Sequence, residues 1–440
     1  MQIDPVFRSN RKRLFAQMQI DSIAIFSTAP VYRRSNDQEH VFYPDNDFYY
    51  LTGFTEPDAI ALLIKSTAAG EQYILFNRRK DPFMEQWVGK RAGQELAVEF
   101  YEADKAFPID EFLTKLPDFL LDKDTLYTTF GRYATLDQDI KTCLNKVRDK
   151  VRTGVRIPDV VINLESLLAE MRLIKNAYEI ECLRQAAKVS VAGHKRCLRA
   201  CKPGSTEYQV HAELIYEFLR QGCQGEAYES IVAGGANTCI LHYIENSAEL
   251  HAGDLLLIDA AGKYNFYAAD VTRTYPVNGR FTAEQRAVYD IVLTAQRAAL
   301  EQVKPGASWG MMSAAAERVI TEGLVDLGIL HGNIDDLLAQ QAFKPYYMHR
   351  IGHWLGMDVH DVGRYKVQQE WRKLVPGMVT TVEPGIYFKP GLAVDEKWIG
   401  IGVRIEDDVL ITATGHEVLT ADLPKAAHEI ELLVQERHDH

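Results

Sequence analysis

The stretch GDLLLIDAAGKYNFYAADVTRTY, residues 253–275, places two acidic side chains inside runs of strand-forming residues. Asp259 follows a run of apolar residues, and Asp270 precedes a second run rich in β-branched residues. An acidic side chain in the middle of a buried strand is costly unless it is paired or bound to a metal. Since either acid alone could lie on a half-exposed strand, the interpretation depends on whether the pattern recurs.

The pattern does recur near the end of the chain. Glu383 lies in GMVTTVEPG, residues 377–385, and Glu406 lies in GVRIEDDVLI, residues 402–411. Each half of this region therefore has one acid, a turn and a second acid on a returning strand, a pattern compatible with an internal two-fold duplication. Because side chains two apart on a strand share a face, Arg404 is expected beside Glu406.

Convergence of the four acids would create a large excess of negative charge. Four carboxylates form six like-charge pairs, and each pair costs about 4 kcal/mol at 4 Å and an effective dielectric near 20. Arg273 and Arg404, even if both turned inward, would leave two charges uncompensated. Two divalent cations would balance the four acids, and oxygen-rich coordination suits manganese, magnesium or calcium. The acids therefore predict a site for two metal ions.

A segment rich in histidine and glycine, YYMHRIGHWLGMDVHDVG at residues 346–363, supplies further candidate ligands. It contains His349, His353 and His360, and its glycines would interrupt a regular helix. A lone histidine is more often structural, but beside four such acids these three are candidates for the site. The segment is not HExxH, which excludes a zincin helix. His242, shortly before the first acid-bearing strand, is another residue that could face the site.

The length, amino-acid composition and net charge of the chain restrict the classes of protein to which it can belong. At about 100–200 residues per domain, 440 residues predict two or three domains. With 47% hydrophobic, 10% aromatic and 25% charged residues, the chain matches an ordinary globular protein. The net charge of −12, without a basic block, argues against nucleic acid or an anionic membrane as partner.

Neither a membrane span nor a secreted protein is expected. No run approaches the roughly 18 apolar residues of a membrane span, and the first residues lack the apolar segment of a signal peptide. The six cysteines form no CxxC pair, which disfavours a disulfide scaffold or a thiolate zinc site. These features favour a cytoplasmic protein.

The chain is expected to form two domains. Strand-like and helical runs alternate from about residue 20 to 155, which predicts an α/β domain. A helix break follows, where Asn176 and Glu179 have capping-box spacing. We therefore predict domains at residues 1–173 and 174–440.

The ordered set of Asp259, Asp270, His353, Glu383 and Glu406 resembles the metal-binding signature of the pita-bread metallopeptidases. Longer strings resemble the aminopeptidase P group of that family: LTGFTEPDA (51–59), LFNRRKDPFMEQWVGKR (75–91), GGANTCILHYIEN (234–246), GHWLGMDVHDVG (352–363) and GIGVRIEDD (400–408). The resemblance covers nearly the whole chain. It implies a creatinase-like α/β amino-terminal domain and a pita-bread α+β carboxy-terminal catalytic domain.

The resemblance also implies roles for individual residues. The family usually binds two manganese ions. Asp259 would bind one of them, and His353 and Glu383 would bind the other. Asp270 and Glu406 would contact both. The implied catalytic residues are His242, His360 and Glu383. The implied substrate-binding residues are Trp87, His242, His349, Tyr387 and Arg404.

Two further implications concern assembly and the edge of the site. Trp87 matches a tryptophan that reaches a neighbouring subunit in similar enzymes, which implies a homo-oligomer, with a tetramer preferred over a dimer. The chain departs from the family pattern at Ala261 and at Arg350-Ile351-Gly352 before His353. Neither departure removes a ligand, and Arg350 is expected to alter the rim of the site.

The implied activity is hydrolysis of the bond between an amino-terminal residue and a following proline, in peptides with proline second. One alternative is a prolidase restricted to dipeptides, because Arg364 or Arg372 could hold the dipeptide carboxylate. Another is a non-catalytic pita-bread protein that binds peptides or proteins. A creatinase, which works without metal, is disfavoured because every ligand is present.

Overall fold

The computed structural model describes residues 3–435, which form two compact units. The first unit ends at Met171 and the second begins at Arg172, close to the boundary predicted between residues 173 and 174.

The first unit is built around a six-stranded mixed sheet. Strands β1, β2 and β3 pair antiparallel, and β4, β5 and β6 join them in parallel. The strand-like runs expected between about residues 20 and 155 include these three antiparallel strands. The spatial order is β4 (Lys105–Pro108), β3 (Gly70–Asn77), β2 (Ile60–Ser66), β1 (Ser22–Ser27), β5 (Thr125–Thr128) and β6 (Val160–Asn163).

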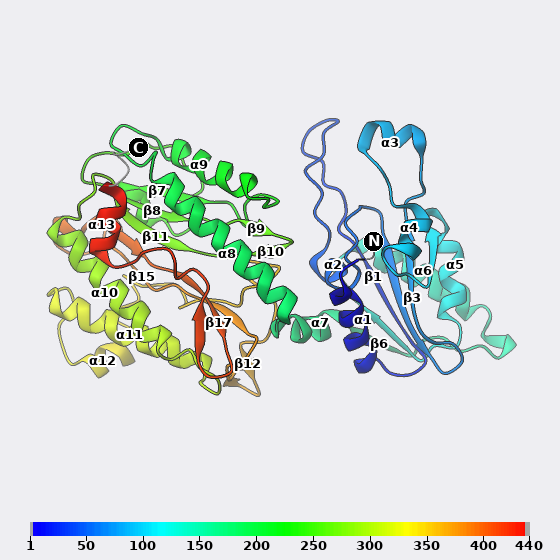
Figure 1. Ribbon diagram of the computed structural model, residues 1–440. Coiled ribbons are helices and arrows are strands. Elements are labelled where there is room, and N and C mark those ends of the chain that lie inside the picture. The colour runs from blue at the N-terminus through cyan, green and yellow to red at the C-terminus, as the bar shows by residue number, and fades with distance from the viewer. Residues whose placement is uncertain (1–2, 436–440) are drawn as a thin grey trace. The chain divides into compact units, whose positions relative to one another are not determined.

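Helices pack beside this sheet, whereas α3 (Pro82–Val88) projects away from it (Figure 1). On one side, Leu116 and Ile140 from two helices share a buried cluster with Ile25 and Leu62 of the sheet. The helices are α1 (Pro5–Gln17), α2 (Asn46–Thr52), α3 (Pro82–Val88), α4 (Gly93–Glu99), α5 (Phe112–Leu120), α6 (Ala134–Arg148) and α7 (Leu164–Leu173), with 3₁₀ turns η1 (Ile109–Glu111) and η2 (Val151–Thr153).

Two three-stranded antiparallel sheets form the centre of the second unit. In the first sheet, β8 (Leu255–Asp259) lies between β7 (Ile231–Gly234) and β11 (Thr272–Pro276). In the second, β17 (Asp407–Ile411) lies between β14 (Val379–Val382) and β18 (His416–Val418). The two repeated sequence patterns thus occupy corresponding strand pairs, β8 with β11 and β14 with β17.

The sequence placed Glu383 and Glu406 inside strands, whereas both lie at breaks. The run after β14 is interrupted at Glu383 and Pro384, where proline has no N–H to donate to a strand ladder. Glu406 lies directly before β17. The remaining strands are β9 (Lys263–Tyr264), β10 (Tyr267–Ala268), β12 (Lys366–Val367), β13 (Glu370–Trp371), β15 (Gly385–Tyr387) and β16 (Gly402–Arg404).

Helices of the second unit enclose one large apolar core with its sheets. The first of them begins at the predicted capping box, in which Asn176 and Glu179 each accept the other's backbone N–H, at 3.1 and 2.9 Å. The helices are α8 (Ala177–Cys197), α9 (Glu207–Arg220), α10 (Ala283–Leu300), α11 (Trp309–Asp326), α12 (Ile334–Ala339) and α13 (Ala427–Gln435), with 3₁₀ turns η3 (Gly235–Cys239) and η4 (Glu396–Trp398).

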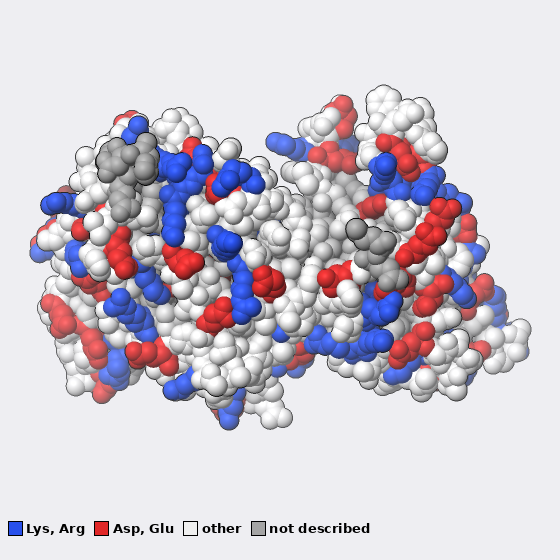
Figure 2. All heavy atoms as spheres, viewed as in Figure 1, with Lys and Arg blue, Asp and Glu red and all other residues white. Residues whose placement is uncertain are grey.

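Basic and acidic side chains are interspersed over both units on the face shown in Figure 2. Among residues 3–435, no helix combines the length and apolarity that crossing a membrane requires.

Candidate active site

The four predicted acids lie at the adjoining ends of the two strand pairs. Asp259 ends β8 and Asp270 shortly precedes β11, whereas Glu383 follows β14 and Glu406 precedes β17. The pairs are joined at Thr272, whose carbonyl accepts the Glu406 N–H at 3.1 Å and whose hydroxyl donates to Glu406 Oε2 at 2.6 Å. All four acids line one cavity of about 600 Å³.

His353 reaches these acids because its segment runs beside β14. Thr381 N–H donates to the His353 carbonyl at 2.9 Å, and Glu383 N–H donates to the Ile351 carbonyl at 2.8 Å. A Cβ on Gly352 would lie 2.2 Å from the Thr381 carbonyl oxygen. The close approach of the two chains therefore requires glycine immediately before His353.

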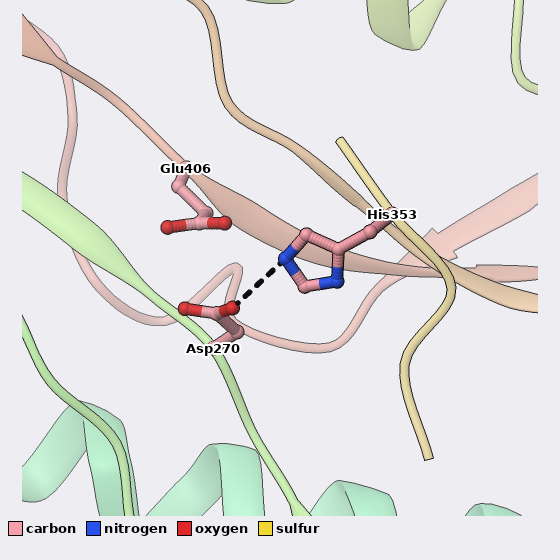
Figure 3. A group of neighbouring side chains, drawn as sticks. All are labelled: Asp270, His353 and Glu406. Atoms are coloured by element: carbon pink, nitrogen blue, oxygen red, sulfur yellow. Dashed lines mark ion pairs between the residues drawn. The ribbon is translucent and has the colours of Figure 1, made fainter. Parts of the chain in front are cut away.

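Asp270, His353 and Glu406 point toward one another, with donor atoms that all lie within 4.8 Å (Figure 3). His353 Nε2 lies 3.2 Å from Asp270 Oδ2 and 3.5 Å from Glu383 Oε1. The other ring nitrogen, Nδ1, donates to the Trp354 carbonyl at 3.0 Å. That hydrogen bond orients the ring so that Nε2 faces the carboxylates, as metal-binding histidines commonly require.

Burial opposes the charge on these carboxylates. Together with neighbouring acids, it raises the pKa of Asp270, raises that of Glu383 to about 7 and raises that of Glu406 well above its usual range. For His353, the effect of burial is outweighed by the hydrogen bond and charge of Asp270, which raise the histidine pKa to about 9. The protein alone therefore stabilises the ionised acids poorly.

Nearby arginines do not neutralise the negative charge of the four carboxylates. Arg404 Nη2 pairs with Asp259 Oδ2 at 2.7 Å, although the sequence placed this arginine beside Glu406. Arg273 pairs with Asp407 at 2.7 Å and donates to the backbone carbonyl of Glu406. A buried set of carboxylate oxygens and one imidazole, with uncompensated negative charge, fits divalent cations.

Tyr228 is a site residue that the sequence analysis missed. Its hydroxyl lies 2.6 Å from Asp259 Oδ1 and 2.7 Å from Asp270 Oδ1, so it bridges the two carboxylates of the first strand pair. Asp408 also supports the site, because its carboxylate accepts the Asp270 N–H at 3.1 and 3.2 Å. Neither residue carries a local signal, since each contact depends on the tertiary fold.

A chain of hydrogen bonds runs from Asp259 through three predicted substrate-binding residues. Arg404 Nη1 donates to the Tyr387 oxygen at 3.0 Å, and the Tyr387 hydroxyl donates to His349 Nε2 at 2.8 Å. His349 Nδ1 donates to the Arg350 carbonyl at 2.8 Å. Burial, reinforced by the charge of Arg404, lowers the pKa of His349 to about 3, so its imidazole is neutral.

His242 and His360 lie at the exposed part of the same cavity, whereas Tyr387 is fully buried behind it. The His360 ring packs edge-on against His353, with ring centroids 4.3 Å apart. Burial, followed by the charge of His353, lowers the pKa of His360. Apolar residues complete the wall: Ile231, Leu241, Ile244 and Val359.

A buried glutamate holds the loop that carries His242. Glu207 Oε1 accepts the Gly234 N–H at 2.7 Å, and Oε2 accepts the Ala248 N–H and the Tyr243 hydroxyl, both at 2.8 Å. These bonds tie both ends and the middle of the loop to one fully buried side chain. Glu207 therefore fixes the part of the cavity wall around His242.

A buried ion cluster holds the residue next to His360. Asp361 pairs with Arg172 at 2.6 Å and with Lys175 at 2.9 Å. Burial alone would raise the pKa of Asp361, but these two cations lower it. The cluster anchors the segment at the point where His360 enters the cavity.

Three other predicted residues are not brought into this cavity. Trp87 belongs to α3 in the first unit and is 75% exposed. Arg364 and Arg372 contact each other through a hydrogen bond from Arg372 Nη1 to the Arg364 carbonyl at 3.1 Å, and neither lines the cavity. The proposed basis for a prolidase therefore finds no support in the cavity wall.

Comparison with known proteins identifies both parts of the chain. Residues 181–413 match metallopeptidase family M24, and residues 7–127 match the aminopeptidase P N-terminal domain. The Xaa-Pro aminopeptidase of Escherichia coli is 44% identical over 428 residues, covering 97% of each chain.

Solved structures agree with these matches. The aminopeptidase PepP of Pseudomonas aeruginosa superposes with a TM-score of 0.98 at 49% identity, covering 100% of both chains. Aminopeptidase P from E. coli with the inhibitor Pro-Leu gives a TM-score of 0.97 at 43% identity, again covering 100% of both chains.

These matches confirm the predicted fold class, an α/β amino-terminal domain followed by a pita-bread catalytic domain. They also confirm the family suggested by the ordered acids and His353. The chain belongs to metallopeptidase family M24, in the group that carries an aminopeptidase P N-terminal domain.

Proposed function

We propose that this chain is an Xaa-Pro aminopeptidase, which hydrolyses the bond between an amino-terminal residue and a following proline. The observation that carries the proposal is the cavity in which four acids and His353 converge, in a chain 44% identical to an Xaa-Pro aminopeptidase over nearly its whole length. The E. coli structure with Pro-Leu further supports a proline-containing substrate.

Two divalent ions would be held by five side chains. Asp259 would contact one ion, His353 and Glu383 the other, and Asp270 and Glu406 both. We propose manganese, because the donors are four carboxylates and one imidazole without sulfur. When bound, such a pair lowers the pKa of water toward neutrality and polarises the scissile carbonyl.

The chain's own residues would then handle protons and orient the peptide. Glu383, which lines the cavity, would accept a proton from the attacking water and pass it toward the leaving nitrogen. His360 would donate a hydrogen bond to the developing oxyanion or to that nitrogen. His242, at the same exposed part of the cavity, would help bind the peptide and transfer protons.

The buried hydrogen-bond chain would position the substrate. Tyr387 and Arg404 hold His349, whose ring lines the cavity in its neutral form. The apolar wall near Ile231, Leu241 and Ile244 would receive the proline ring, which has no N–H to donate.

The rival functions have less support. A dipeptidase needs a positive group that holds the carboxylate just beyond proline, and such a group would disfavour longer peptides. Arg364 and Arg372, the candidates for that group, do not line the cavity. A non-catalytic binding protein would have no need for five complete ligands.

We also propose that the protein acts in the cytoplasm as a homo-oligomer, with a tetramer preferred over a dimer. The exposed Trp87 on α3, which has no buried residues, supports a surface that another subunit covers.

The metal site predicts a specific loss on changing one ligand. Glu406→Gln removes a negative charge at nearly constant shape, so metal content should fall and turnover should drop by about 100-fold or more. Metal analysis and turnover on an Xaa-Pro-Yaa peptide measure the effect. Wild-type protein should contain up to two ions per chain.

Glu417→Gln is the matched control, because Glu417 forms an exposed ion pair with Arg184. It should keep both metal and activity. Full turnover by wild-type protein from which metal has been stripped would refute the metal-dependent proposal.

His360 is predicted to act in chemistry without holding metal. His360→Ala should lower kcat by about 100-fold or more, the usual contribution of a general acid or base. Metal content should stay near that of the wild type. Loss of metal from this variant would instead make His360 a ligand.

Substrate length and proline dependence are predicted together. The enzyme should release the first residue from Xaa-Pro-Yaa and from longer Xaa-Pro peptides, and it should cleave the matched Xaa-Ala peptides much more slowly. Quantifying the released amino acid measures both effects. Cleavage confined to the Xaa-Pro dipeptide would identify a prolidase, and equal rates on Xaa-Ala peptides would exclude proline specificity.

The oligomer is predicted to depend on α3. Light scattering at assay concentration should give a mass above one chain, and Trp87→Ala should weaken assembly or raise KM. Phe130→Ala, which changes another exposed aromatic residue of the same unit, is the control. A monomeric wild-type protein with full activity would contradict the proposed role of Trp87.

A further inference from the structure

Arg350 is an exposed residue whose position on the cavity wall is well defined. It lines the 600 Å³ cavity that contains the acids. Its backbone lies between two anchored neighbours: His349 is bonded to the Tyr387 hydroxyl, and the Ile351 carbonyl accepts the Glu383 N–H. The base of the side chain is therefore held, whereas the guanidinium extends from an exposed position.

The guanidinium of Arg350 makes no hydrogen bond or ion pair with any residue in the described range 3–435. The other arginine of the cavity wall, Arg404, donates from each of its three nitrogens, to Thr272, Tyr387 and Asp259. Among the described residues of this wall, Arg350 is thus the arginine whose guanidinium has no protein partner.

The positive charge of Arg350 also affects a second residue of the cavity wall, Tyr365. Tyr365, another wall residue, has a pKa raised by burial, and the charge of Arg350 partly opposes that rise. The Tyr365 hydroxyl is fixed because it accepts the Trp354 N–H at 2.9 Å. Arg350 and Tyr365 thus belong to the same cavity wall.

An aminopeptidase substrate must pass this part of the cavity. The bond to be cleaved is one residue from the amino terminus, so the buried acids would receive the reacting end. The chain beyond proline must leave toward solvent, where the exposed wall residues lie. Arg350 is one of these, along with His242 and His360.

We infer that Arg350 is a specificity-determining residue that binds a substrate carboxylate beyond proline. This inference rests on the proposed function. The carboxylate has two possible sources: an acidic side chain at the third position, or the terminal carboxylate of a short peptide. A guanidinium recognises either through paired N–H donors, and its fixed fork distinguishes it from lysine.

Such binding would give the enzyme a preference on the leaving side of the substrate, which cleavage after the first residue does not by itself require. Unlike a dipeptidase clamp, an exposed arginine leaves no buried charge unpaired when the carboxylate is absent. Neutral peptides would remain substrates, and anionic ones would bind more tightly at low ionic strength.

Two pairs of peptides separate the sources. Ala-Pro-Glu-amide against Ala-Pro-Gln-amide tests the side chain, and Ala-Pro-Ala against Ala-Pro-Ala-amide tests the terminal carboxylate. For the wild type we expect kcat/KM to favour the anionic member of at least one pair. Arg350→Gln should reduce that preference by about 5–10-fold, mainly through KM, and Arg350→Lys should restore part of it.

Glu229 provides the matched control. It is an exposed wall residue of opposite charge, also without a hydrogen bond or ion pair to the described residues, so Glu229→Gln should not reduce the preference. Raising the salt concentration should weaken the preference in the wild type and leave the Arg350→Gln variant little changed.

The peptide assays test the role of Arg350 and the proposed aminopeptidase activity separately. Loss of preference in one peptide pair assigns the source of the carboxylate, and loss in both assigns both. Unchanged ratios in Arg350→Gln for both pairs would overturn the role of Arg350 while leaving the aminopeptidase intact. Failure of the metal-loaded wild type to cleave any of these peptides would instead overturn the proposed function and, with it, the inference.

Discussion

Four carboxylates converge in the interior of the second unit with one arginine paired to them, and the surrounding structure is arranged around this excess of negative charge. Asp270, Glu383 and Glu406 are all driven toward protonation by burial and by one another. A protein keeps such a cluster only at a cost in stability, unless cations compensate it. The same feature that destabilises the cluster without metal would favour the binding of the divalent ions that we propose.

The buried contacts around the cluster restrict where its members can move. Tyr228 joins the two acids of the first strand pair, and Thr272 joins that pair to Glu406. Farther out, Glu207 holds the loop of His242, and Asp361 holds the segment of His360. Removing one partner from a buried ion cluster such as that of Asp361 typically costs about 3–5 kcal/mol, so this anchor couples site geometry to folding stability.

The sequence predicted those parts of the structure that have a local cause. Apolar runs predicted β8 and β14, and spacing predicted the capping box at Asn176. It did not predict the breaks that put Glu383 and Glu406 at strand ends, or the pairing of Arg404 with Asp259. Tyr228, Glu207 and Asp361 were missed because their partners are distant in the chain and meet only after folding.

Anomalous diffraction from crystals grown with Mn²⁺ tests the central claim most directly, because it locates the ions independently of activity. The account predicts two manganese peaks in the cavity, surrounded by Asp259, Asp270, His353, Glu383 and Glu406, with no side chain of His360 or Arg350 in contact with either ion. Absence of a peak among these five residues at saturating Mn²⁺ would contradict the account, as would ions bound only elsewhere on the protein.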